Sequence, residues 1–278
     1  MQLLFRLLLV SWIVSFLSGC GGGNPTTPSF LSFGPAVLYR FTESAGNSTV
    51  QDTAPAPNST VSDDASVFDY AGNPATLVSL PAFGNGPAQL PSFPNGLLYF
   101  YRPYLEAPHS ADYNLTGAAT LITWVRAVPC GAGFVSGLLD KYDPSNNTGC
   151  ALWLRQTGGA NPQAIPEVQL GTSTFTATAG FPADISSPIA PSLSSGTWYM
   201  LAVVIGGGNL SFYLNGQPAG SFPIPPGANP VNTQSVFIGK SRIHSSFCEF
   251  AMSGMVLFKQ ALAPGAIGAI HSLGPGGL

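Results

Sequence analysis

The chain has 278 residues, of which 45% are hydrophobic and only 8% are charged, with a formal net charge of -3. This length is enough to bury a core in one large all-β domain or in two smaller domains. The few basic residues are scattered, and only Lys240 and Arg242 lie close together. Nucleic-acid binding needs clustered Lys and Arg, so the composition argues against it, whereas a neutral surface rich in Ser, Thr and Asn suits an exported protein.

The amino terminus is expected to be a targeting segment and a linker. The run LLLVSWIVSFL at residues 7–17 is apolar but short for a membrane span, as in a signal peptide. The four residues LSGC at 17–20 resemble the bacterial lipobox, in which cleavage before the cysteine follows attachment of a diacylglycerol to its sulfur. We therefore expect a lipoprotein signal peptide at residues 1–19, then a lipidated Cys20 and a flexible linker at residues 20–35. An ordinary secretory signal with a chance cysteine is the alternative.

The lipobox resemblance also implies a location for the protein. An Asp straight after the lipidated cysteine keeps such lipoproteins in the inner membrane, and Gly21 stands there instead. We therefore expect an exported protein that its lipid anchor holds at the outer membrane or cell surface.

Residues 36–274 are expected to form one domain of short strands. Runs that alternate apolar and polar residues, or that are apolar throughout, are separated by Gly and Pro. The expected strands are VLYRF (37–41), GLLYFYR (96–102), TLITWVRAV (120–128), GFVSGLLDKY (133–142), CALWLRQ (150–156), WYMLAVVI (198–205), SVFIGKS (235–241) and FAMSGMVLF (250–258). Residues 55–75 are expected to be a loop, and APGAIGAIHS (263–272) to form one short helical turn. Many short strands with turn residues between them predict a sandwich or a barrel.

The clearest local signal is GGGNLSFYLNGQPAGSF at residues 206–222. Leu210, Phe212 and Leu214 fall on one face of a strand. Asn215-Gly216 supplies the positive φ angles of a tight turn, so this segment predicts a β-hairpin.

Five motifs in this order resemble laminin G-like domains of the concanavalin A-like lectin/glucanase class. The motifs are YLEAPHSADYNLTGAATLITWVRAV (104–128), GLLDKYD (137–143), GTWYMLAVVIGGGNLSFYLNGQPAG (196–220), VFIGKS (236–241) and MVLFKQALAPGAIGAI (255–270). The resemblance implies an all-β, two-sheet antiparallel jelly-roll sandwich with one short helical turn near the C-terminus. The closing strand of the family commonly carries an Asp-Glu pair where this chain has Ser253 and Gly254, so any role of that pair is absent here.

Catalysis by a glucanase of this fold class needs two carboxylates that converge on one glycosidic bond. The twelve Asp and Glu residues contain no Glu-x-Asp-x-x-Glu arrangement, and Asp140 and Asp143, three residues apart, split across two faces. The three histidines lack zinc-ligand spacing and the context of a nucleophile elbow. We therefore expect no catalytic residues, with an enzyme whose carboxylates are distant in sequence as the alternative.

Two groups of side chains are candidates for binding. The resemblance to calcium-binding domains makes Asp140, Asp143 and Asn146 in the loop LDKYDPSNNTG a candidate calcium site, although Asp and Asn also favour a plain hairpin loop. Sugars stack on aromatic rings, and Tyr142 and Tyr213 lie in expected loops or on polar faces. These two tyrosines are therefore the candidate carbohydrate-binding residues, whereas the tryptophans of the strands are expected in the core.

Three cysteines remain after Cys20, so one thiol has to stay single if an exported protein forms a disulfide. If strand 250–258 runs antiparallel to strand 120–128, as the resemblance implies, Cys248 lies beside Cys130. The resemblance therefore implies a Cys130–Cys248 disulfide, and a Cys130–Cys150 bridge would contradict it.

Three functions remain open. The expected function is a surface-anchored lipoprotein with a non-catalytic carbohydrate-binding or adhesion domain, whose partner is an extracellular glycan or another polymer. This expectation rests on analogy between folds. The alternatives are a glycoside hydrolase or lyase with an unrecognised active site, and a protein-protein adhesion or assembly module.

Overall fold

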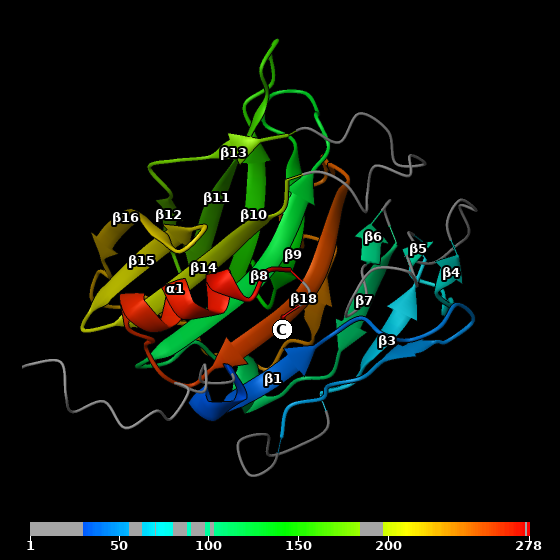
Figure 1. The fold of residues 1–278 in the computed structure, drawn as a ribbon, viewed down its shortest axis with the longest axis horizontal. Coiled ribbons are helices and arrows are strands. Elements are labelled where there is room, and N and C mark those ends of the chain that lie inside the picture. Colours follow the sequence, from blue (N-terminus) through cyan, green and yellow to red (C-terminus); the bar gives the residue numbers. More distant parts are fainter. Residues whose placement is uncertain are drawn as a thin grey trace, which may run out of the picture. The chain divides into compact units, whose positions relative to one another are not determined.

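The runs expected to be strands form two sheets, which Figure 1 shows for the computed structural model of the chain. The structure describes residues 30–55, 63–69, 71–79, 88–89, 98–100, 103–183, 197–275 and 277–278. The expected signal peptide, Cys20 and most of the expected linker lie outside the described residues. Phe33–Leu278 forms one compact unit, and the description below concerns this unit.

Sheet A has the strand order β16-β15-β14-β8-β18-β6-β5-β4, and β1 pairs with β18. Its strands are β1 (Pro35–Tyr39), β4 (Val78–Ser79), β5 (Ala88–Gln89), β6 (Leu98–Phe100), β8 (Ala119–Ala127), β14 (Tyr199–Gly206), β15 (Asn209–Leu214), β16 (Gln217–Pro223) and β18 (Phe250–Phe258). The pairing is antiparallel apart from β4 with β5.

Sheet B has the strand order β12-β11-β10-β9-β17-β7-β3-β2, and β13 pairs with β11. Its strands are β2 (Thr49–Val50), β3 (Ala65–Phe68), β7 (Tyr104–Ala107), β9 (Val135–Asp140), β10 (Cys150–Gln156), β11 (Gln163–Leu170), β12 (Ser173–Thr176), β13 (Phe181–Pro182) and β17 (Val236–Ile238). Among the described residues, the helical segments are the 3-10 turns η2 (Phe30–Phe33) and η3 (Ala111–Tyr113) and the helix α1 (Pro264–Ser272). In the part of the chain that the structure describes, no helix is long and apolar enough to cross a membrane.

The core lies between the two sheets and takes every second residue of their central strands. Sheet A contributes Leu121 and Val203, and sheet B contributes Leu139 and Leu152. The run TLITWVRAV forms β8, an interior strand that pairs with β14 on one side and β18 on the other. The expected two-sheet antiparallel jelly-roll sandwich with one short C-terminal helix is therefore confirmed.

One local expectation was wrong. Residues 55–75 were expected to be a loop, yet they contain β3 (Ala65–Phe68), which pairs with β7. The short strand forms because Val67 is buried in the core while its neighbours face outward.

Helix α1 covers the outer face of sheet A. It buries Ile267 and Ile270, and Figure 1 shows it lying across β14 and β8. The ring of His271 in α1 stacks on Trp124 of β8 with ring centres 5.5 Å apart. The other buried side chains of this outer face include the apolar Ile122, Met200, Val204 and Val256, together with the polar or charged Thr120, Arg126 and Ser253.

Candidate binding face

The outer face of sheet B is charged and aromatic. Side chains alternate along a strand, so the neighbours of core residues such as Leu105 and Leu139 point away from the core. Glu106, Phe237 and Asp140 are cross-strand partners in one row of this face. We call this surface the sheet B face; its side chains are Phe68, Tyr104, Glu106, Asp140, Trp153, Arg155, Glu167 and Phe237.

Three aromatic rings form a continuous ladder across β3, β7 and β17. Phe68 stacks on Tyr104 with ring centres 5.4 Å apart, and Tyr104 meets Phe237 edge to face at 5.1 Å. Phe68 and Phe237 are partly exposed. The ladder therefore presents ring surface on the outer face of sheet B, which suits the apolar face of a flat ligand.

A segment that we call the strap, residues 239–248, crosses the sheet B face. The ammonium of Lys240 lies 4.0 Å from the ring centre of Tyr104, and the guanidinium of Arg242 lies 3.7 Å from that of Phe237. The ring of His244 meets Trp153 at 4.7 Å. The strap thus caps one side of each of these rings with a basic or imidazole group.

A glycine in β9 makes the close crossing of the strap possible. A Cβ atom on Gly137 would lie 2.5 Å from the carbonyl oxygen of Lys240. Only a residue without a side chain fits there, so Gly137 lets the strap backbone rest directly on the sheet.

Two ion pairs fix the charged groups of the face. The Arg242 backbone N–H donates to Asp140 Oδ2 at 2.7 Å. The side-chain Nη1 of Arg242 lies 3.3 Å from Asp140 Oδ1. Glu167 Oε2 accepts from Arg155 Nη2 at 2.7 Å and from Trp153 Nε1 at 2.8 Å. Burial alone would raise the pKa of Glu167, but the hydrogen bonds from Arg155 and Trp153 outweigh it and lower that pKa.

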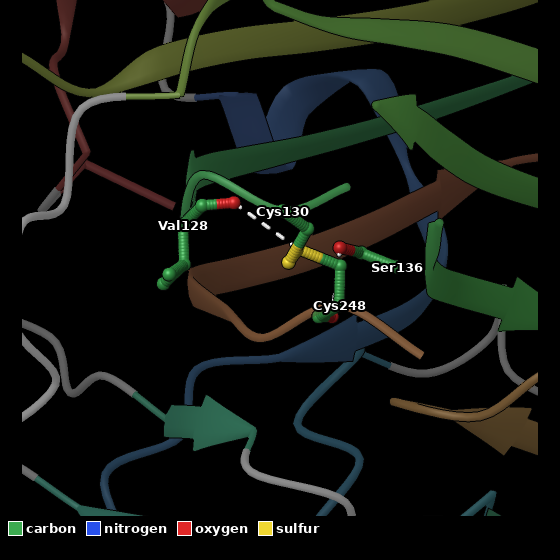
Figure 2. Close-up of a disulfide and its surroundings, with 4 residues drawn as sticks. All are labelled: Val128, Cys130, Ser136 and Cys248. Atoms are coloured by element: carbon green, nitrogen blue, oxygen red, sulfur yellow. Dashed lines mark hydrogen bonds between the residues drawn. A yellow bond between two sulfur atoms is a disulfide. The ribbon is translucent and has the colours of Figure 1, made fainter. Parts of the chain in front are cut away.

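The strap is covalently tied to the loop before β9. Figure 2 shows the disulfide between Cys130 and Cys248, whose Cα atoms are 6.0 Å apart. Next to it, the Ser136 hydroxyl donates to the Cys248 carbonyl at 2.9 Å, and the Val128 carbonyl oxygen lies 3.1 Å from the Cys248 sulfur. This is the pair that the sequence led us to expect, and it fixes the end of the strap.

Cys150 is the free, buried cysteine of the described residues. Burial raises the pKa of its thiol to about 12. The thiol therefore stays protonated at neutral pH and behaves as a core side chain.

The structure does not gather the three candidate calcium ligands around one point. Asp140 points to Arg242, whereas Asp143 Oδ2 accepts from the Asn146 side-chain amide at 2.8 Å and Oδ1 accepts from the Ser145 N–H at 2.9 Å. These are the hydrogen bonds of a turn. Among the described residues, no group of three His, Cys, Asp or Glu side chains is placed to hold a metal ion.

The two candidate tyrosines lie in different environments. Tyr142 was expected to be accessible, but only 5% of it is exposed, because it packs on the sheet B side with Val135, Ala151 and Trp153. Its ring is therefore not available to a sugar. Tyr213 of β15 is partly exposed on sheet A, where it pairs with Ala202.

The carboxylates of the sheet B face are already engaged by protein donors. Besides the two ion pairs, Glu106 accepts from the Ser235 hydroxyl at 2.6 Å. Asp63, whose pKa is raised to about 7 by burial, is fully buried, and its backbone carbonyl accepts from the Tyr39 hydroxyl. A protonated acid at that depth cannot reach a polymer, so these residues do not assemble the two accessible carboxylates of a glycosidase.

The ladder and the strap were missed from the sequence. VFIGKS was identified only as a strand, and Lys240 and Arg242 were used only to argue against nucleic acid. The sequence did contain one indication of this site. Phe237 lies just before Lys240 and Arg242, which are closer to each other than any other two of the nine Lys and Arg residues.

The fold and the sheet B face define a lectin-like jelly-roll sandwich. Residues 102–268 match a laminin G family model described as Concanavalin A-like lectin/glucanases superfamily. The match covers more than half of the chain, so the chain belongs to this superfamily, as the order of its motifs predicted. No curated protein sequence matches the chain.

Solved structures of toxin binding domains share the fold. The binding domain of botulinum neurotoxin serotype D/C is 13% identical with a TM-score of 0.57, and the match covers 88% of this chain and 53% of that one. A botulinum neurotoxin type C structure, whose title describes cell entry dependent on two ganglioside molecules, is 13% identical with a TM-score of 0.57 and coverages of 87% and 51%. The binding domain of Paraclostridial Mosquitocidal Protein 1 is 11% identical with a TM-score of 0.55 and coverages of 87% and 52%. The chain thus spans about half the length of these structures, and the likeness concerns the fold.

Proposed function

We propose that this chain is a surface lipoprotein whose sandwich domain binds an extracellular carbohydrate without transforming it. The observation that carries the proposal is the aromatic ladder of the sheet B face. Phe237 and Phe68 are partly exposed; Lys240 Nζ lies 5.2 Å from the Phe237 ring centre, and Glu106 is the cross-strand partner of Phe237, so ring surface and polar groups occur together. Specific ligand sites combine apolar surface with a few fixed polar groups in this way.

The positions of the few basic residues in the chain support the choice of this face. Arg155, Lys240 and Arg242 are three of the nine Lys and Arg residues, and all three lie on or over the sheet B face. The strap and its disulfide hold Lys240 and Arg242 in place, and Glu167 holds Arg155, which lowers the entropic cost of binding.

The solved relatives are consistent with a ligand of this kind. One botulinum neurotoxin structure is described with two ganglioside molecules, and another is a complex with SialylT. A third is a complex with rat synaptotagmin II, which makes a protein partner the second candidate. The exposed apolar side chains Phe134 and Ile243, 40% and 37% exposed, favour that second candidate.

The anchoring part of the proposal rests on the sequence. Cys20 in its lipobox would carry the lipid, and residues 20–35 would hold the domain away from the outer membrane or cell surface. Calcium at the loop of Asp143 and Asn146 stays a prediction, which the experiment below includes.

The test is a glycan and polysaccharide binding screen on the chain from Asn24 onward, run with calcium and with a chelator. We expect binding to at least one glycan. For that glycan, Phe237→Ala should weaken binding about tenfold, which corresponds to roughly 1.4 kcal/mol. Tyr213→Ala, a partly exposed aromatic on the other sheet, is the matched control and should bind as the parent does.

Four results would overturn or change the proposal. Equal loss in both variants, or loss in Tyr213→Ala alone, would move the site to sheet A. Shortening of the polymer during incubation would support the alternative function, a glycoside hydrolase or lyase. Absence of binding in both conditions would favour the protein partner, and binding that disappears with chelator would make the site calcium-dependent.

A further inference from the structure

Lys141 directs its charged group into the end of the sandwich. Asp140 points outward to Arg242, so the alternation of the strand sends the next side chain inward. Lys141 has no exposed surface. Its ammonium donates to Asn114 Oδ1 at 2.9 Å, to the Asn232 carbonyl at 2.6 Å and to Asn232 Oδ1 at 2.9 Å.

Lys141 and the two residues that supply the three oxygen atoms lie in segments far apart in the sequence. Asn114 follows η3, Lys141 follows β9, and Asn232 precedes β17. The Asn232 side-chain amide also donates to the carbonyls of Lys141 and Thr148, at 2.6 and 3.0 Å. One ammonium group therefore joins three loops, and we call these three oxygen atoms and their surroundings the Lys141 cage.

The loops of the Lys141 cage shape one end of the molecule. Residues adjoining Asn114 and Asn232 line an open pocket of about 270 Å³, including Leu115, Thr116, Gly117, Ala228 and Pro230. The position of these pocket walls thus depends on the cage.

The ammonium has no carboxylate among its three partners. All three are neutral amide or carbonyl oxygens, and an ammonium group has three N–H donors, so donors and acceptors match in number. Burial lowers the pKa of Lys141 to about 8, with the Cys150 thiol, Arg242 and Lys259 nearby. The group therefore remains mostly charged at neutral pH, and its oxygen partners replace part of the lost hydration.

We propose that the Lys141 cage is a cation site that the protein fills with its own side chain. The ammonium holds the three loops together as a bound ion would. Emptied by mutation, the site would take a small primary ammonium ion, whose three N–H groups match the three oxygens. Calcium would not substitute, because it prefers six to eight oxygens including carboxylates. This inference does not depend on the proposed carbohydrate binding.

The test is chemical rescue of Lys141→Ala. Propylammonium replaces the atoms from Cγ to Nζ that this variant lacks. We expect Lys141→Ala to unfold at a lower temperature than the parent, and propylammonium to raise its midpoint by at least about 3 °C in a concentration-dependent way. Tetramethylammonium, which has no N–H group, and calcium should have no such effect.

Lys141→Met is the matched control, because it fills the volume with an uncharged chain and leaves no room for the ion. It should be destabilised and unaffected by propylammonium. Equal effects of propylammonium on both variants, or none on Lys141→Ala, would overturn the proposal.

If Lys141→Ala does not fold alone, its refolding yield can be measured with propylammonium and with tetramethylammonium. The yield should be higher with propylammonium. Asn114→Asp supplies a second measurement, since a carboxylate would then face the ammonium. Its thermal midpoint should exceed that of the parent at pH 7, and an unchanged or lower midpoint would also count against a cation site.

Discussion

The two outer faces of the sandwich are both covered, but by different chemistry. On sheet A, Trp124 and its apolar neighbours lie under helix α1, which contributes Ile267 and Ile270. On sheet B, rings and carboxylates lie under the strap, which contributes Lys240, Arg242 and His244.

This difference separates the scaffold from the proposed binding surface. A mainly apolar cover gains its stability by excluding water from the face beneath it. A cover of cationic side chains over aromatic rings leaves some rings partly exposed, such as that of Phe237, with N–H groups beside them. Changes to the first face should therefore alter stability alone, whereas changes to the second should alter both stability and binding.

Removing the disulfide should have the largest effect and should act on the sheet B face. Cys130 and Cys248 are separated by 118 residues, and the chain-entropy model gives about 4 to 5 kcal/mol for a loop of this length. We expect the double variant Cys130→Ser/Cys248→Ser to lose that much free energy of unfolding in urea titrations, and to bind its glycan more weakly because the strap is no longer fixed. Cys150→Ala, which keeps the disulfide, should retain binding. Undiminished binding in the double variant would show that the strap does not depend on the disulfide.

Trp124→Ala tests the opposite face. Trp124 is 3% exposed and stacks on His271, so its truncation should cost about 3 kcal/mol through the lost packing of β8 against α1. Glycan affinity, measured below the unfolding temperature, should equal that of the parent. Trp124→Phe should recover most of the stability. A loss of affinity in the folded Trp124→Ala protein would contradict the division between the faces.

The two faces also differ in how far the sequence reveals them. Strands such as β8 and β18 are long and apolar, so their pairing follows from the family order of motifs, and the partners Cys130 and Cys248 follow from that pairing. Tyr142 shows the limit. It was expected in a loop or on a polar face, yet it is buried, because Val135, Ala151 and Trp153 pack around it.

The strap explains why the binding face could not be predicted. Its path over Gly137 depends on the backbone positions of β9 and of residue 240, which are distant in the sequence. The aromatic ladder likewise joins Phe68, Tyr104 and Phe237 from three strands, one of them in a segment expected to be a loop. No local pattern brings such residues together.

The smallest effect should come from Glu167, and its dependence on pH distinguishes the faces further. The pKa of Glu167 is lowered in the folded protein from an ordinary value of 4.5, so the folded state favours its ionised form. That stabilisation is fully present above pH 4.5 and is lost as the pH falls through the lowered folded-state pKa. We expect Glu167→Gln to lose about 1 to 2 kcal/mol at pH 5.5, because its charge-assisted hydrogen bonds to Arg155 and Trp153 become neutral.

Urea titrations of Glu167→Gln and Trp124→Ala between pH 5.5 and pH 3 check this. The difference between parent and Glu167→Gln should shrink steadily toward pH 3, whereas the loss in Trp124→Ala should stay constant, because that side chain is uncharged. A Glu167→Gln difference that does not change with pH would mean that the ion pair with Arg155 adds nothing to the sheet B face.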